Sequence, residues 1–307
     1  MQEPWSRYLR LGIVHFMAYP AVMKGEGPYV ETLREIAADP FFTAVEVGWV
    51  HDAEQRKQAA RLLAEAHLAV GFGAQSALLA TKSDLNAADE KARQSAVALV
   101  KGCVDQAVDL GARRLAVLSG PYPGAADEAK AVDRLVASLE ELCEYGRGRG
   151  VGITLETFDR TIEKKALAGP TPLCVAISER VRRRYPDFGL MLDLSHLPLL
   201  GERTRDALIG ARHHLVHAHI GNCAMHDRAH AAYGDVHPRF GIVGGENDTP
   251  EVLEFLRVLF EIGYLGKETG EDRRPFLSFE VKPLPGEATA TVVAGTKRVF
   301  ADAWAML

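Results

Sequence analysis

Four side chains of the kind that bind metal ions end four short apolar segments in the second half of the chain. The segments read VGITLE, GLMLD, LVHAH and FLSFE, and their last residues are Glu156, Asp193, His219 and Glu280. If each segment is a β-strand, its side chains alternate between two faces, and these four lie opposite the apolar residues. One such residue alone is more often a helix cap or a packed side chain. Four at equivalent positions indicate a shared site.

A shared site of this composition has a clear electrostatic requirement. Three carboxylates that converge repel one another and raise one another's pKa. A divalent cation removes this conflict, and three carboxylates with one imidazole suit metals that prefer oxygen ligands. The pattern therefore predicts a divalent metal bound by these four residues, with Mn²⁺ favoured and Mg²⁺, Co²⁺ or Zn²⁺ as alternatives.

The elements that must position these side chains alternate along the whole chain. Apolar runs rich in Val, Ile and Leu cover residues 11–17, 43–49, 69–75, 114–119, 151–157, 188–194, 215–220 and 276–281. Between them, amphipathic stretches predict helices over 29–38, 53–68, 87–110, 125–147, 172–184 and 203–212, one with Thr249 as its N-cap, and a last one up to Trp304. Eight strand–helix units predict an α/β fold, a single (β/α)8 TIM barrel over residues 1–307. An open doubly wound sheet is the alternative.

One long connection, residues 222–248, follows the seventh predicted strand. Active sites of TIM barrels lie at the C-terminal ends of the strands, so this connection would cover the catalytic face. A loop of this length is usually functional or disordered. It contains Asp235 and His237, and we expect it to be a functional loop.

Composition narrows the class of protein. The 307 residues are 47% hydrophobic and 25% charged, which is typical of a globular domain, and the net charge of -5 argues against a nucleic-acid partner. No apolar stretch is long enough to span a membrane, and the N-terminus lacks a signal-peptide core. The four cysteines form no CxxC pair. We therefore expect a cytoplasmic protein with reduced thiols; a homo-oligomer is compatible with this sequence.

These motifs resemble those of the xylose-isomerase-like barrels, a superfamily that includes epimerases of the D-tagatose 3-epimerase type, hydroxypyruvate isomerase, inosose dehydratase and endonuclease IV. The resemblance lies in Glu156 of ITLETF, in DLSH from Asp193 to His196, in HIG from His219, in Glu280 of FLSFE, and in the VEVG motif that contains Glu46. It covers nearly the whole chain and implies the same four metal ligands. It is specific for the superfamily and weak for the reaction.

The resemblance also implies roles for further residues. In the epimerases the two glutamates act as acid and base, and the counterpart of His196 contacts substrate. In endonuclease IV that histidine binds a further zinc together with an Asp-x-His pair, which Asp235 and His237 resemble; a mobile polar loop is the alternative for these two. Two departures stand out. Met225 replaces a substrate-supporting arginine of the epimerases, and Gln75 and Ser119 replace two histidines of the endonucleases.

The leading hypothesis is a metal-dependent isomerase or epimerase of a keto sugar or related polyhydroxy carbonyl compound. Proton transfer by Glu156 and Glu280 through a metal-held enediolate would perform the reaction. A dehydratase, or a phosphodiesterase similar to endonuclease IV, is the alternative. Lys282 lies two residues after Glu280, on the same face of the predicted strand, and is a candidate electrostatic partner in the site. Trp49 is a candidate for the wall of a sugar-binding pocket. A solvated lysine and a packed tryptophan are the simpler interpretations of these two.

Overall fold

The computed structural model describes residues 1, 3–266 and 274–307 of the chain. Each of the eight predicted apolar runs contributes one β-strand. The strands are β1 (Arg10–Ile13), β2 (Ala44–Val47), β3 (Ala69–Gly73), β4 (Arg114–Val117), β5 (Gly152–Glu156), β6 (Gly189–Asp193), β7 (Leu215–Gly221) and β8 (Phe276–Glu280).

The strands form one parallel sheet in the order β1-β8-β7-β6-β5-β4-β3-β2. Each strand therefore pairs with its sequence neighbours, and β1 pairs with β8. β1 and β2 complete the ring through a parallel bridge between Val14 and Glu46 and a hydrogen bond from the Thr43 N–H to the Leu11 carbonyl. The (β/α)8 prediction is confirmed, and the open-sheet alternative is wrong.

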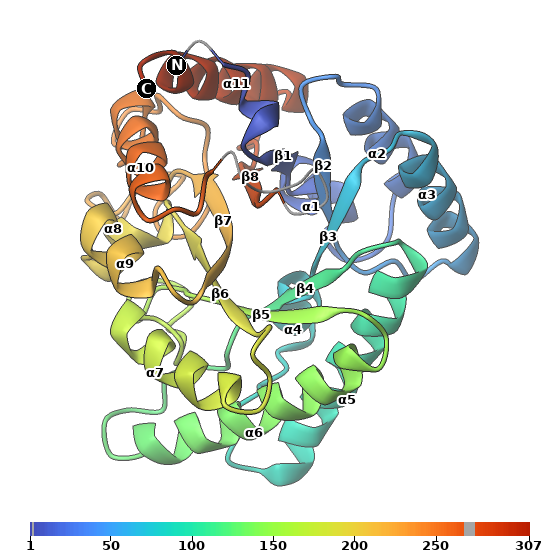
Figure 1. The fold of residues 1–307 in the computed structure, drawn as a ribbon, viewed down its shortest axis with the longest axis vertical. Helices are drawn as coiled ribbons and strands as arrows, with labels where there is room; N and C mark the ends of the chain where they lie inside the picture. The colour runs from blue at the N-terminus through green and yellow to red at the C-terminus, as the bar shows by residue number, and fades with distance from the viewer. Residues whose placement is uncertain (2, 267–273) are drawn as a thin grey trace.

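Helices alternate with the strands along the chain, and the longer ones surround the ring on the outside (Figure 1). They are α1 (His15–Ala18), α2 (Tyr29–Ala37), α3 (Ala53–Glu65), α4 (Gln75–Thr81), α5 (Glu90–Asp109), α6 (Glu128–Arg147), α7 (Thr171–Arg182), α8 (His196–Leu200), α9 (Thr204–Ala211), α10 (Thr249–Glu261) and α11 (Thr289–Ala305), with 3-10 turns at Trp5–Arg7 and Pro20–Val22. Among these described helices, none is long and apolar enough to cross a bilayer.

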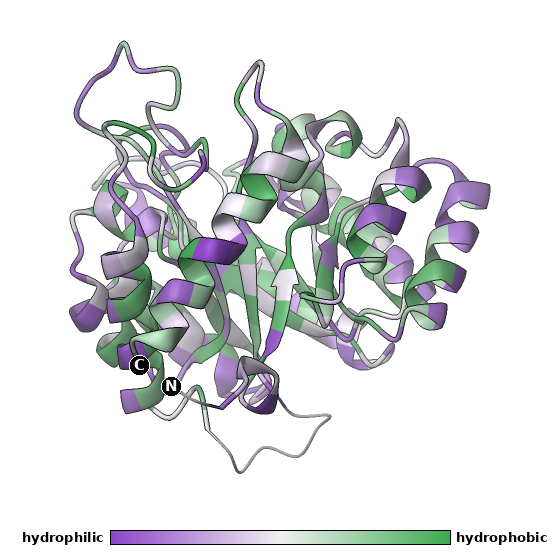
Figure 2. Ribbon diagram, turned by 90° about the horizontal axis from the view of Figure 1, so that it is seen from above, coloured by the Kyte–Doolittle hydropathy of each residue, from purple (hydrophilic) through white to green (hydrophobic). Residues whose placement is uncertain are grey.

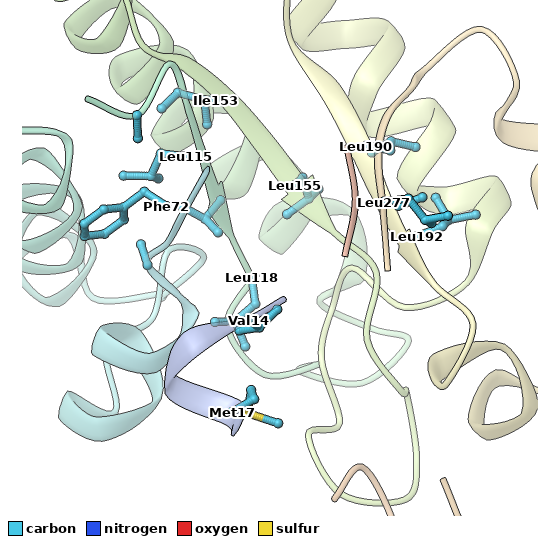
Figure 3. Close-up of a cluster of buried hydrophobic side chains, with 14 of the residues drawn as sticks. Val14, Met17, Phe72, Leu115, Leu118, Ile153, Leu155, Leu190, Leu192 and Leu277 are labelled. Carbon is cyan, nitrogen blue, oxygen red and sulfur yellow. The ribbon is translucent and has the colours of Figure 1, made fainter. Parts of the chain in front are cut away.

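The hydrophobic core lies between the strands and the outer helices. Figure 3 shows Ile153 and Leu155 of β5, with Leu190 and Leu192 of β6, in this buried cluster. Because these residues alternate with Thr154 and Glu156 along β5, the polar side chains face the barrel interior. The alternation expected from the sequence is therefore what sends the site residues inward.

Three local predictions were wrong. The run 11–17 is not one strand, because β1 ends at Ile13 and α1 begins at His15; a helical turn that is buried all round has no periodicity to distinguish it from a strand. The strand over 69–75 ends at Gly73, and Gln75 begins α4. The N-cap of α10 is Asp248 rather than Thr249: Asp248 and Glu251 form a capping box.

The two ends of the barrel differ. The chain termini lie toward one end, and long loops rise beyond the barrel at the other (Figure 2). Because all strands are parallel, the four predicted ligand residues, each at or near a strand's C-terminal end, lie at the same end of the barrel.

Candidate active site

The four predicted metal-ligand residues lie together at the C-terminal ends of β5 to β8. One ligand atom from each of Glu156, Asp193, His219 and Glu280 lies within 4.8 Å of the others. All four side chains are buried or nearly so. We name this group the carboxylate cluster.

His219 joins the carboxylate cluster to β2. Its Nδ1 lies 2.7 Å from Glu280 Oε2, 3.6 Å from Asp193 Oδ2 and 3.7 Å from Glu156 Oε1. Its Nε2 lies on the opposite side of the ring, 2.9 Å from Glu46 Oε1. When Nε2 carries a proton and donates it to Glu46, Nδ1 is oriented to offer its lone pair to a cation.

Glu46 is held between two histidines. Its Oε1 also accepts a hydrogen bond from His217 Nε2 at 2.7 Å. Burial alone would raise the pKa of Glu46, but the charges of His217 and His219 outweigh burial and hold that pKa well below its usual range. The pKa of His219 is correspondingly raised well above its usual value, against the effect of burial, mainly by Glu46 and Glu280. Glu46 therefore fixes the His219 ring from behind.

The donor atoms of the carboxylate cluster fit a divalent cation. Glu156 Oε1 and Asp193 Oδ2 are buried and make no hydrogen bond to any residue that the structure describes. Leaving buried charged oxygens without partners is costly, and a cation satisfies them. Burial, and next the Glu280 carboxylate, raise the pKa of Glu156 to about 8. Burial opposes ionisation of Glu280 as well, but His237 and His219 outweigh it and lower the pKa of Glu280 to about 2.

Gln75 positions Glu156. Its Nε2 donates a hydrogen bond of 2.6 Å to Glu156 Oε2, so that Oε1 remains for another ligand. The sequence predicted Gln75 only as the replacement of an endonuclease histidine. Its role depends on α4, a helix that the sequence pattern did not reveal.

A second group of polar side chains adjoins the carboxylate cluster. Asp235 Oδ1 lies 3.0 Å from His196 Nε2 and 2.8 Å from His237 Nε2, and Asp235 Oδ2 lies 3.1 Å from Lys164 Nζ. His196 also donates from Nδ1 to the Thr157 carbonyl at 2.6 Å. We name His196, Asp235, His237 and Lys164 the histidine cluster.

The charges of the histidine cluster stabilise one another. Burial would lower the pKa of His196, but Asp235 outweighs burial and raises it to about 10. The pKa of His237 rises to about 9 against burial because of Glu280 and Asp235. The pKa of Asp235 is held well below its usual range, although burial opposes this, by His196 and His237. At neutral pH both imidazoles are therefore protonated in the absence of a cation.

The two clusters meet at His237. Its Nε2 lies 3.6 Å from Glu280 Oε1, and its Nδ1 lies 4.0 Å from Asp193 Oδ2 and 3.3 Å from the Ser195 hydroxyl. The ligand atoms of Asp193, His196 and His237 also lie within 4.8 Å of one another, so they form a further group that could hold an ion. The clusters together make one continuous polar site.

The long connection 222–248 lies against the barrel mouth at this site. The Lys282 N–H donates to the His237 carbonyl at 2.7 Å, and Asn247 Nδ2 donates to the Gly221 carbonyl at 3.0 Å. The Asp235 N–H donates to Glu163 at 2.6 Å, which ties the connection to the loop after β5. His237 therefore reaches the carboxylate cluster, and Asp235 lies behind it, against His196 and His237. Their roles as ligands or substrate contacts stay predictions.

Lys164 is a site residue that sequence reasoning missed. It lies in the loop between β5 and α7, where the Asp159 side chain accepts hydrogen bonds from three successive backbone N–H groups, those of residues 162, 163 and 164. This turn holds the Lys164 backbone, and the side chain reaches Asp235. The adjacent lysines Lys164 and Lys165 are only a weak sequence signal for a site residue, because lysines in a loop are usually solvated.

The side chains of two predicted site residues, Lys282 and Trp49, make no hydrogen bond or ion pair with either cluster. The Lys282 side chain makes no hydrogen bond or ion pair with them, and only its backbone contacts His237. Trp49 donates from Nε1 to the Met23 carbonyl at 3.1 Å, and its ring lies 4.5 Å from the ring of His51. Their assignments to the substrate pocket stay predictions.

Comparisons with known proteins agree with this architecture. A family model described as a xylose isomerase-like TIM barrel matches residues 34–274. The solved structure of an L-ribulose 3-epimerase aligns with a TM-score of 0.73 at 18% identity, over 97% of this chain and 96% of the other. A D-psicose 3-epimerase crystallised in the presence of D-fructose gives 0.68 at 15% identity, over 97% and 98%.

A third similar structure is that of a protein with a different activity. An AP endonuclease of family 2 from Brucella melitensis aligns with a TM-score of 0.67 at 17% identity, over 93% of this chain and 97% of the other. No curated protein matches the sequence significantly. At these identities the structural likenesses establish the fold alone.

Proposed function

Because the chain belongs to the xylose isomerase-like TIM barrel family, we propose that it is a divalent-metal-dependent isomerase or epimerase of a keto sugar or related polyhydroxy carbonyl compound. One observation carries the proposal. Two buried carboxylate oxygens, on Glu156 and Asp193, have no hydrogen-bond partner among the described residues and face the Nδ1 of an imidazole that Glu46 orients. The 3-epimerases among the structural neighbours support the choice of substrate class.

Glu156, Asp193, His219 and Glu280 would hold the metal, with Mn²⁺ favoured by the three carboxylates. When bound, the cation supplies Lewis acidity that makes a C–H bond beside a substrate carbonyl more acidic. His219 offers Nδ1 and keeps its Nε2 on Glu46, and Gln75 leaves Oε1 of Glu156 available. These contacts would orient the donor atoms of His219 and Glu156 toward the cation.

Glu156 and Glu280 are the proposed acid and base. They come from β5 and β8, which are separated by two strands in the sheet, so their carboxylates approach a bound substrate from different sides. One carboxylate would accept the proton from carbon, and the other would return a proton to the opposite face or to the adjacent carbon. The first outcome is epimerisation and the second is isomerisation.

The histidine cluster is the proposed substrate-binding wall. The pKa values of His196 and His237 are raised to about 10 and about 9, which favours the protonated imidazoles. Both N–H groups of His196 are directed at Thr157 and Asp235, so the donor proposed for a substrate oxygen is His237 Nδ1, whose contact with the Ser195 hydroxyl is long at 3.3 Å. Asp235 can accept from a hydroxyl. Lys282 and Trp49 remain candidates for the rim of the pocket. Met225 in place of a family arginine places more of the substrate contacts on the histidine cluster.

A phosphodiesterase similar to endonuclease IV is the second candidate, and the histidine cluster favours it. His196, Asp235 and His237 form the three-residue group that in such enzymes binds a further zinc, and one structural neighbour is an AP endonuclease. Gln75 stands where the endonucleases carry a histidine and is committed to Glu156, which argues against a full zinc set. A dehydratase on a similar carbonyl substrate is the other alternative.

The test is incubation of the Mn²⁺-loaded protein with candidate ketoses in D₂O, followed by NMR and by identification of the product. We expect deuterium at a carbon beside the carbonyl with wild type, and a loss of ~10²–10⁴-fold in rate with Glu156→Gln or Glu280→Gln. Glu65→Gln, on the exposed end of α3, is the control that should leave the rate unchanged. Incision of abasic DNA without turnover of any ketose would favour the phosphodiesterase instead.

A further inference from the structure

The opposite end of the barrel contains a cavity with a different chemistry. It has a volume of about 730 Å³ and lies at the N-terminal ends of β1, β3, β4, β7 and β8. A cavity of this size accommodates a ligand as large as a mononucleotide. Four arginines line it, and no acidic residue does among the residues that the structure describes: Arg10, Arg113, Arg114 and Arg274.

Arg114 is the central cation of this cavity. Its guanidinium is partly buried at the start of β4 and donates from Nη1 to the Thr154 hydroxyl at 3.1 Å and, at 3.4 Å, to the Asp187 carbonyl. Both partners are neutral, and Arg114 forms no ion pair within the described part of the chain. Burial lowers the pKa of Arg114, and the more distant Asp187 carboxylate opposes this effect only in part. A charge in this situation gains from an anion that supplies the missing partner.

One glycine, Gly152, lies directly beside this guanidinium. A Cβ atom at Gly152 would lie 3.4 Å from the guanidinium atoms of Arg114. Gly71, on β3, is one of the residues that line the cavity itself. Arg113, which directly precedes β4, is exposed, and its side chain makes no hydrogen bond or ion pair with any described residue. An arginine guanidinium offers several N–H donors in a geometry that matches phosphate oxygens.

The inner wall of the cavity separates it from the candidate active site. His217 closes the cavity from within and is only 3% exposed. Its Nε2 is bonded to Glu46, which in turn is bonded to His219. The imidazole is thus already engaged, so the cavity offers cationic guanidinium groups and an apolar wall that includes Tyr264 and Phe276, rather than a set of metal ligands.

We propose that this cavity binds a small phosphorylated organic compound, with Arg113 and Arg114 holding its phosphate group. The apolar wall would contact the uncharged part of the ligand. The proposal does not depend on the reaction catalysed at the other end of the barrel, because the two sites share no residue.

The test is isothermal titration of the full-length protein with AMP, inorganic phosphate and adenosine as probes. We expect AMP to bind and adenosine to bind at least about tenfold more weakly, because the phosphate supplies the charge-assisted hydrogen bonds. Equal affinities for AMP and phosphate would show that the arginines alone recognise the ligand. Tighter binding of AMP would show that the apolar wall contributes. No binding of AMP or phosphate at millimolar concentration would overturn the proposal.

Three variants locate the binding site. Arg114→Gln and Arg113→Gln should each weaken AMP binding about tenfold, which is the loss of one charge-assisted contact. Arg183→Gln removes one charge from an exposed arginine cluster at the end of α7 and should leave binding unchanged. If Arg114→Gln does not fold, the exposed Arg113 decides the question. Wild-type affinity in the folded arginine variants would place AMP elsewhere and overturn the proposal.

Discussion

The carboxylate cluster holds three acidic side chains and one imidazole, whereas the histidine cluster holds one acidic side chain, two imidazoles and an ammonium group. Both are buried at the same end of the barrel, and His237 lies between them. Their charge balance nevertheless differs. The carboxylate cluster has an excess of negative charge, and the histidine cluster has an excess of positive charge.

Because their charges differ, only one of the two clusters requires a counter-charge from outside the protein. Buried like charges are tolerated only when a counter-charge is present. In the carboxylate cluster, burial raises the pKa of Asp193 and the pKa of Glu156. In the histidine cluster, the pKa of Asp235 falls well below its usual range in spite of burial, because cations surround it. We infer that the carboxylate cluster needs an external cation and that the histidine cluster does not.

The largest expected effect separates the clusters by metal content. Asp193→Asn keeps the side-chain shape and removes a charged ligand. The variant should lose its divalent ion, and its turnover rate should fall ~10²–10⁴-fold. Asp235→Asn is the matched variant in the histidine cluster and should keep the ion. Elemental analysis of both purified proteins measures the difference. Loss of the ion from Asp235→Asn as well would break the comparison, because the second cluster would then contribute to metal binding.

A smaller effect is expected behind the carboxylate cluster. Glu46→Gln removes the charge that orients His219, and loss of such a supporting carboxylate typically weakens metal affinity ~10–100-fold. Titration of the metal-free variant with Mn²⁺ measures the change. His217→Gln is the control for general disturbance of the interior, because His217 contacts Glu46 and the edge of the His219 ring but offers the cluster no ligand atom, and its effect should be smaller. An unchanged affinity in Glu46→Gln would mean that the His219 ring is held by packing alone.

The third prediction concerns the counter-charge of the histidine cluster. Lys164→Gln leaves Asp235 with only the two imidazoles, and loss of a buried charge-assisted contact should lower the free energy of unfolding by about 1–3 kcal/mol. Lys165→Gln is the matched control, because that neighbouring side chain is exposed. Urea denaturation gives the free energies, and elemental analysis should show unchanged metal. Equal stabilities of the two variants would show that Lys164 is not needed to balance Asp235.

The sequence predicts the carboxylate cluster better than the histidine cluster for a physical reason. Glu156, Asp193, His219 and Glu280 lie on strands, where the alternation of side chains fixes the face and the parallel order fixes the end of the barrel. Loop residues have no such periodicity. Asp235 and His237 were therefore found only through a family resemblance.

Gln75 and Lys164 show the same limit. Gln75 reaches Glu156 because a short helix begins directly after β3, and Lys164 reaches Asp235 because two loops far apart in the sequence pack together. Neither contact leaves a periodic signal.

The smallest expected effect is on the pH dependence of stability. It compares His196 with His15, a buried histidine outside both clusters. His15 packs edge-on against Tyr29, and its Nε2 lies 2.8 Å from the Thr32 hydroxyl, while its Nδ1 has no hydrogen-bond partner among the described residues. Burial without a carboxylate lowers the pKa of His15 to about 3. His196, buried beside Asp235, has its pKa raised to about 10 instead. The two histidines should therefore change the stability of the fold with opposite signs of pH dependence.

For His15, the folded pKa lies below the unfolded value of about 6.5, so the unfolded chain takes up a proton that the folded chain refuses. The stability that His15 contributes is complete above that value and falls as the pH drops toward 3, with a loss of about 0.7 kcal/mol between pH 7 and pH 6. His15→Phe keeps an aromatic ring and removes the titration, so the stability of this variant should fall less steeply than that of wild type between pH 7 and pH 6.

For His196→Phe the change in slope has the other sign. The raised pKa of His196 makes its stabilising contribution complete below the unfolded pKa, and this contribution is lost as the pH rises through 10. Urea denaturation at each pH compares slopes rather than absolute stabilities, so the packing cost of each substitution cancels. The quantity compared is the change in the slope of stability against pH, relative to wild type. If both substitutions change this slope with the same sign, Asp235 does not hold His196 in its protonated form.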